Sequence, residues 1–70
     1  MTNIEIVQKY HGEVNKLYAE KSKAVAHIER GYLYKKYITI LDAMLKGGTL
    51  TKEDYDDITS RMILIGLSKI

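Results

Sequence analysis

The sequence predicts an all-α protein of three helices, one long and two shorter, which form a helical bundle completed by oligomerisation. None of the 70 residues is proline, so no residue forces a helix to break. Apolar residues also return at helical spacing along most of the chain. Glycines at Gly31 and at Gly47-Gly48 divide the chain into three segments. We expect a single small helical domain over residues 1–70, with helices at about 3–30, 32–46 and 52–67.

The first predicted helix covers residues 3–30. Thr2 and Glu5 form a capping box at its start, in which each side chain satisfies the other residue's backbone N–H. Apolar side chains return every seven residues at three heptad positions, which is the width typical of a helix that faces a core. These positions hold Val7, Val14, Lys21 and Ile28; Tyr10, Leu17 and Ala24; and Ile4, His11, Tyr18 and Val25. Lys21 departs from the apolar pattern, and we expect its stem to pack while its ammonium reaches solvent.

A helix of this length spans roughly 40 Å and is longer than either segment that follows it. We therefore expect another chain to cover part of its apolar stripe, because monomers rarely expose so large an apolar surface. The absence of cysteine removes disulfides and thiolate metal sites as sources of stability, which favours a homodimer or higher oligomer at this size. The residues predicted for self-association are Ile4, Val7, Tyr10, Val14, Leu17 and Tyr18.

The second helix is predicted over residues 32–46. The apolar pattern changes phase at Arg30-Gly31, which indicates a turn into an antiparallel hairpin, with one bent continuous helix as the alternative. Lys46 followed by Gly47-Gly48 indicates the end of this helix, because glycine readily adopts the left-handed conformation that closes a helix.

The third helix is predicted to begin at Lys52. Thr51 is a suitable N-cap, the acids of the first turn suit the helix dipole, and Leu50 can pack against Tyr55. The residues predicted to face inward are Tyr55, Ile58, Met62 and Ile65.

The last turns of the third helix are apolar over more than one side, because Ile63, Leu64 and Leu67 widen the inward stripe. A single short neighbour does not need so broad a surface. Residues 60–70 are therefore a second candidate for burial between chains, or else the most buried segment of the monomer.

The segment from Leu41 to Met62 resembles the SHOCT domain, a short C-terminal helical hairpin of bacterial proteins. The turn of that hairpin reads glycine, an aliphatic residue, threonine, acids and an aromatic residue. The matching residues here are Gly48, Leu50, Thr51, Glu53, Asp54 and Tyr55. The resemblance covers about a third of the chain and implies an interaction or oligomerisation role. SHOCT hairpins usually follow a larger domain or a membrane segment, whereas one long predicted helix precedes this one.

The charge pattern offers a nucleic-acid surface as an alternative. The net charge is only +2, but four basic residues recur every seven positions and form a stripe that could follow phosphates. These residues are Lys9, Lys16, Lys23 and Arg30. Because Glu13 and Glu20 follow Lys9 and Lys16 by four residues, an ion-pair ladder on a solvated face is the favoured interpretation.

No motif indicates catalysis, a cofactor or a metal. The chain has no nucleophile elbow, phosphate loop or dinucleotide fingerprint. His11 and His27 lie about 24 Å apart along the predicted first helix, too far for one ion. We find no secretory or lipidation signal and no apolar run long enough to span a bilayer, so we expect a cytoplasmic location. Charges of both signs on the polar face argue against binding to a membrane surface.

These observations predict a non-enzymatic protein–protein interaction module. Small, lysine-rich, cysteine-free helical chains are typical of bacterial and phage regulators, so we expect a self-associating regulator or inhibitor with a protein partner. The alternative is a small dimeric helical protein that binds nucleic acid. The residues predicted to contact a protein partner are Tyr32, Tyr34, Lys35, Lys36, Tyr37, Asp54 and Asp57.

Overall fold

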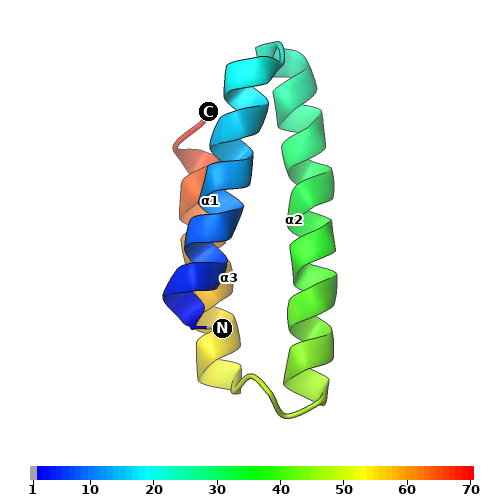
Figure 1. Ribbon diagram of the computed structural model, residues 1–70, viewed down its shortest axis with the longest axis vertical. Helices are drawn as coiled ribbons and strands as arrows, with labels where there is room; N and C mark the ends of the chain where they lie inside the picture. Colours follow the sequence, from blue (N-terminus) through cyan, green and yellow to red (C-terminus); the bar gives the residue numbers. More distant parts are fainter. Residues whose placement is uncertain (1) are drawn as a thin grey trace.

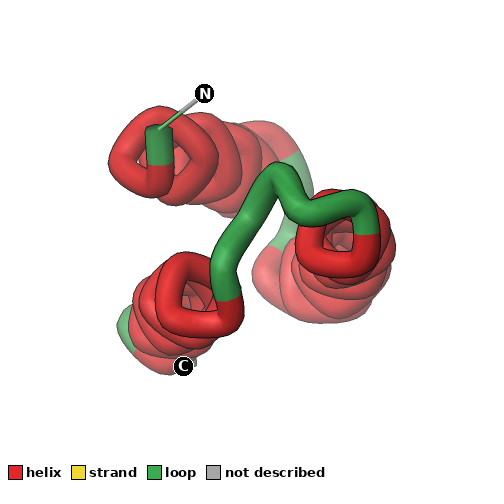
Figure 2. The backbone as a smooth tube through the Cα atoms, turned by 90° about the horizontal axis from the view of Figure 1, so that it is seen from below, coloured by secondary structure: helices red, strands yellow, loops and turns green. Residues whose placement is uncertain are grey.

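The computed structural model describes residues 2–70, which form three α-helices and no strand. The helices are α1 (Asn3–Glu20), α2 (Lys23–Lys46) and α3 (Lys52–Leu67). Figure 1 shows α1 and α3 running in the same direction and α2 running antiparallel to both. Seen along the bundle, the helices occupy the corners of a triangle (Figure 2). The predicted all-α class is confirmed.

The predicted length of the first helix is wrong. The first helix ends before Lys21 and Ser22, which both have extended backbone, and not at Arg30-Gly31. The Ser22 hydroxyl accepts a hydrogen bond from the Val25 N–H at 3.4 Å and caps the start of α2, as serine commonly does at helix starts. Apolar heptad spacing continues across this break, which is why the pattern concealed it. Gly31 lies inside α2, where neither a turn nor a neighbouring atom requires glycine.

The other helix ends lie where they were predicted. At the start of α1, the Thr2 hydroxyl accepts from the Glu5 N–H at 3.2 Å, although the Glu5 carboxylate accepts from that hydroxyl and not from a backbone N–H. α2 ends at Lys46 in a Schellman motif, in which Gly48 has φ +79° and the Thr49 N–H donates to the Met44 carbonyl at 2.9 Å.

The start of α3 at Lys52 is also confirmed. The Thr51 hydroxyl accepts from the Asp54 N–H at 3.1 Å, and Leu50 is buried beneath the turn. On the inward side of α3, Ile58 and Met62 are fully buried and Tyr55 and Ile65 pack against them.

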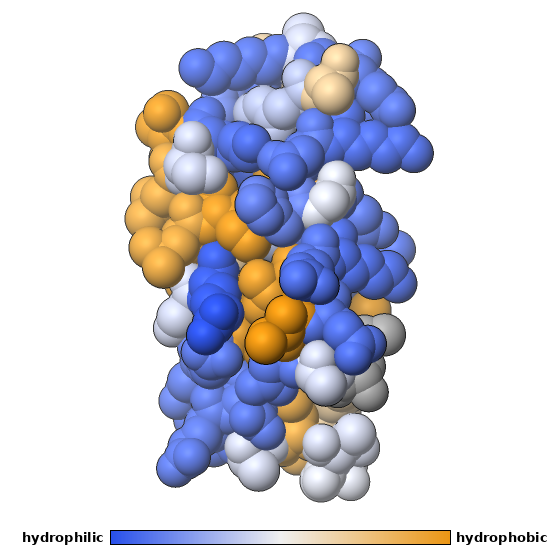
Figure 3. Space-filling model, turned by 60° about the vertical axis from the view of Figure 1, so that its left-hand side comes forward, coloured by the Kyte–Doolittle hydropathy of each residue, from blue (hydrophilic) through white to orange (hydrophobic). Residues whose placement is uncertain are grey.

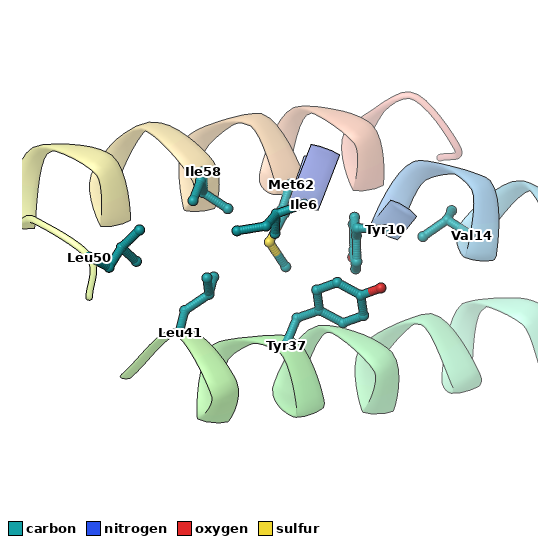
Figure 4. Close-up of a cluster of buried hydrophobic side chains, with 8 residues drawn as sticks. All are labelled: Ile6, Tyr10, Val14, Tyr37, Leu41, Leu50, Ile58 and Met62. Carbon is teal, nitrogen blue, oxygen red and sulfur yellow. The ribbon is translucent and has the colours of Figure 1, made fainter. Parts of the chain in front are cut away.

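The core runs between all three helices. Figure 4 shows side chains of α2 pointing toward those of α1 and α3. Tyr10 and Tyr37 meet at its centre in an edge-to-face contact, with ring centroids 5.1 Å apart. The buried residues of this cluster are Ile6, Tyr10, Val14, Tyr37, Leu41, Leu50, Ile58 and Met62.

The expectation that the stripe of the first helix is uncovered is also wrong. With 18 residues, α1 is matched in length by α3 with 16 and exceeded by α2 with 24. Tyr10 and Val14 are consequently buried within the single chain. Val7, Leu17 and Tyr18 are partly buried, and Ile4 is the one predicted self-association residue that is mainly exposed. Self-association itself stays a prediction and needs a different surface.

Candidate interaction surface

Large aliphatic side chains are left uncovered near one another on the last turns of α3 and just beyond its end, where Ile70 lies. We call Ile63, Leu64, Leu67 and Ile70 the α3 patch; they are 50%, 65%, 59% and 81% exposed. Figure 3 shows hydrophobic side chains gathered over this end of the bundle. The inward stripe of α3 already contains Ile58, Met62 and Ile65. Helical rotation therefore places Ile63, Leu64 and Leu67 on the other side of the helix. Residues 60–70 are therefore not the most buried segment of the monomer, because their outward side is exposed. Burial of this side between chains stays a prediction.

The α3 patch borders a hollow of about 290 Å³ between α2 and α3. Arg30 spans the hollow and donates from Nη1 to the Gly66 carbonyl at 2.6 Å, which ties the last turn of α3 to α2. The residues around the hollow include Tyr10, Arg30, Tyr34, Ile63, Leu67 and Ile70. A side chain from a second molecule therefore has both an apolar surface and a recess to pack against.

The acidic first half of α3 is engaged in local contacts. Asn3 of α1 donates to Asp54 at 2.9 Å, and this hydrogen bond, with those from Thr51, lowers the pKa of the Asp54 carboxyl. Asp57 accepts from Arg61 at 3.0 Å and Asp56 from Lys52 at 2.9 Å. The two acids predicted to bind a partner, Asp54 and Asp57, thus have partners within the chain.

The aromatic and basic cluster predicted at residues 32–37 does not form one surface. Tyr37 is buried, and its hydroxyl donates to the Glu13 carboxylate; burial, followed by this hydrogen bond, raises the pKa of Tyr37. Tyr34 is half-buried at the hollow beside α3. Tyr32 and Lys36 line a separate groove of about 540 Å³ between α1 and α2, and Lys35 is exposed. Helical rotation separates these neighbours in sequence.

The predicted basic stripe is not continuous. Lys9 and Lys16 lie on α1, but the break at residues 21–22 places Lys23 on α2, and Arg30 is occupied by the Gly66 carbonyl. The predicted Lys–Glu ladder is also not formed. Within residues 2–70 the ion pairs join Lys21 to Glu29, Lys52 to Asp56 and Arg61 to Asp57. No feature of this arrangement favours the nucleic-acid alternative.

The two histidines have no common site. His11 is exposed on α1, while the His27 ring lies 2.5 Å from the Tyr18 hydroxyl through Nδ1. In the described part of the chain, no three His, Cys, Asp or Glu side chains are grouped so that they could hold a metal ion. None of the helices in that part is both long and apolar enough to cross a membrane.

The signal for the α3 patch was present in the sequence as the excess apolar width of residues 60–70, but Ile70 and the hollow beside Arg30 were not recognised. The four-residue spacing of Ile63 and Leu67, opposite the inward stripe, marks this second side. No family model, curated protein or solved structure matches the chain. The resemblance to the SHOCT hairpin therefore stays a prediction.

Proposed function

We propose that this protein is a non-enzymatic interaction module that self-associates through the α3 patch. The observation that carries the proposal is the exposure of four adjacent aliphatic side chains on a chain whose core is closed without them. Removing one such side chain fully from water contributes roughly 1.5–3 kcal/mol, so burial of these half-exposed side chains provides a substantial driving force for association. Contiguous exposed apolar patches commonly mark protein interfaces.

The proposed role is that of a small regulator or inhibitor of bacterial or phage type. Association through α3 leaves the groove between α1 and α2 accessible, because this groove lies between the other two helices. Lys16, Leu33 and Lys36 line it together with Tyr32, so a protein partner would find apolar and charged groups side by side there. The self-associated form would then present two such grooves.

Substitution of Leu67 by glutamate tests the proposal. We expect the unchanged protein to be a dimer by light scattering coupled to size exclusion, and Leu67→Glu to be a folded monomer by the same measurement and by circular dichroism. A buried, unpaired carboxylate in the interface is strongly unfavourable.

Ile28→Glu is the matched control, because Ile28 is 61% exposed on α2 and Leu67 is 59% exposed on α3. This control should remain dimeric. Ile4→Glu places the same charge on the exposed start of α1, within the apolar stripe that the sequence predicts for self-association. A monomeric unchanged protein would contradict self-association, and a dimer lost in Ile4→Glu but kept in Leu67→Glu would move the interface to α1.

A further inference from the structure

The hollow of about 290 Å³ between α2 and α3 is lined by one cation and, among the described residues, by no acid. Arg30 is that cation, and the other residues around the hollow are aromatic or apolar side chains and glycines. The groove between α1 and α2, by contrast, contains lysines and glutamates together. An apolar recess with a single unbalanced positive charge is complementary to an anion that carries an aliphatic chain.

Arg30 is held in position without a counter-ion. Its Nη1 atom donates to the Gly66 carbonyl at 2.6 Å, and the side chain is half-buried. Within residues 2–70, none of the ion pairs includes Arg30, and its Nε and Nη2 atoms donate to no other residue. A guanidinium that is fixed along one edge and unoccupied along another is suited to bidentate hydrogen bonding with a carboxylate.

The Tyr10 hydroxyl is a second polar group near Arg30. Tyr10 lines the hollow and is only 1% exposed, and its ring packs edge-to-face against Tyr37. Burial raises the pKa of Tyr10, and the nearby charge of Arg30 opposes this effect. Unlike the Tyr37 hydroxyl, which donates to Glu13, the Tyr10 hydroxyl bonds to no described residue. Since buried hydroxyls usually have a hydrogen-bond partner, the oxygen of a bound molecule would supply the missing acceptor.

We infer that this hollow binds the carboxylate of a fatty acid, with Arg30 as its ion-pair partner and the Tyr10 hydroxyl as a hydrogen-bond donor. A volume of about 290 Å³ is at the small end for ligand pockets, so the hollow takes the headgroup and the first methylenes. The rest of the alkyl chain lies over Ile63 and Leu67 of the α3 patch. This inference goes beyond the proposed function and does not depend on it, but the fatty acid and a second copy would compete for the same surface.

Titration with sodium octanoate, followed by NMR, tests the site. The amide signals of glycines fall in a separate region of a nitrogen–proton spectrum, and the chain has five glycines. Gly31 and Gly66 line the hollow, whereas Gly12, Gly47 and Gly48 do not. At a protein concentration low enough to dissociate a dimer, we expect saturable shifts at the first two glycines. Shifts of equal size at all five would show general association with apolar surface and overturn the inference.

The headgroup and the alkyl chain are tested separately. Octanol has the same chain without the charge and octylammonium reverses the charge, so both should bind at least about tenfold more weakly than octanoate. Decanoate should bind about tenfold more tightly than octanoate, because each buried methylene contributes up to about fourfold. Equal binding of octanoate and octanol would show that Arg30 does not recognise the carboxylate, and would overturn the inference.

Substitution of Arg30 tests the ion pair. Arg30→Gln removes the charge but retains an amide that can donate to the Gly66 carbonyl, and it should weaken octanoate binding at least about tenfold. Arg61→Gln is the matched control, because Arg61 lies on α3 and pairs with Asp57 outside the hollow. It should change the affinity by less than about twofold. Equal losses in the two variants would show a general effect of net charge and overturn the inference.

Tyr10→Phe keeps the ring that packs against Tyr37 and removes only the hydroxyl. It should weaken octanoate binding by about twofold to fivefold without lowering the midpoint of thermal unfolding, because that hydroxyl has no partner within the chain to lose. This variant and octanol still decide the matter if circular dichroism shows that Arg30→Gln is unfolded. Unchanged binding in Tyr10→Phe would remove the hydroxyl from the site and overturn the inference as stated.

Light scattering of the same samples separates this site from the proposed self-association. A protein that is monomeric at every concentration and binds octanoate beside Gly31 and Gly66 would overturn self-association alone. A dimer that dissociates on dilution into a monomer without octanoate-dependent shifts would overturn the fatty-acid site alone. If both proposals hold, octanoate should lower the fraction of dimer at a fixed protein concentration.

Discussion

The two halves of α3 bury the same inward side, but the outward side is charged in the first half and aliphatic in the second. In the first half, Thr51 caps the helix, Asn3 bonds to Asp54 and the outer surface is charged. In the second half, Met62 completes the core while the α3 patch remains uncovered. The contrast shows that the fold requires only the inward stripe. The aliphatic outer side of the second half is not explained by the stability of the single chain.

The largest expected effect separates the inward from the outward side. Ile58→Ala should reduce the free energy of unfolding by about 2–5 kcal/mol, because Ile58 is fully buried and its loss leaves a cavity. Leu64→Ala should change it by less than about 0.5 kcal/mol in the monomer, since most of that side chain is exposed. Urea unfolding measures both changes, at protein concentrations low enough for the dimer to dissociate.

The same pair should respond differently to protein concentration. Association stabilises a fold in proportion to the logarithm of the concentration, so Leu64→Ala should lose stability mainly at high concentration and Ile58→Ala at every concentration. Equal losses for the two variants at low concentration would mean that Leu64 packs within the monomer, and the distinction between the two sides would fail.

A smaller effect is expected at the capped start of the first half. Thr51→Ala should cost about 1 kcal/mol of stability, because the hydroxyl that accepts from the Asp54 N–H is lost. Ser60→Ala is the control, since Ser60 is exposed within the helix and alanine favours helix there. Thermal unfolding should show a lower midpoint for Thr51→Ala and an unchanged or slightly higher midpoint for Ser60→Ala. Loss of the dimer in Thr51→Ala, with the fold intact, would show that the first half also contributes to association.

The smallest effect concerns the pH response of Asp54. Its pKa lies below the ordinary value of 3.8 because Asn3, and then Thr51, donate hydrogen bonds to the carboxyl. A carboxyl with a lowered pKa in the folded state contributes stability above the unfolded pKa, and this contribution is lost as the pH falls through the folded pKa. Asn3→Ala should therefore raise the Asp54 pKa toward 3.8, as measured by NMR titration of the side-chain carboxyl. An unchanged pKa would mean that Thr51 alone determines it, and Thr51→Ala is the matched comparison.

Local signals predicted most helix ends correctly. Thr2, Thr51 and the Gly47-Gly48 pair each act on atoms within a few residues of themselves, so their effect is legible without the rest of the fold. Ser22 is an equally local cap and was overlooked because Val14 and Ile28 continue the heptad on either side of it. Heptad spacing indicates which residues are compatible with one helix, but it does not show that the helix is unbroken.

The candidate surface was only partly predictable. The excess apolar width of residues 60–70 was visible, but the choice between the inside of the monomer and an interface depended on the position of α2 and α1. The cluster from Tyr32 to Tyr37 shows the opposite case, since neighbours in sequence point in different directions around α2. Tyr37 enters the core and bonds to Glu13, while Tyr32 faces the groove beside α1.

By itself the sequence determined the all-α class, the end of the second helix at Lys46, the start of the third at Lys52, and the inward stripe of Ile58 and Met62. These properties depend on helix propensity, capping and apolar periodicity, which act over one or two turns. Only the tertiary structure decided that α1 is covered within the chain and that the α3 patch is not. Burial depends on which helices meet and at what length, and the early break at Ser22 set those lengths.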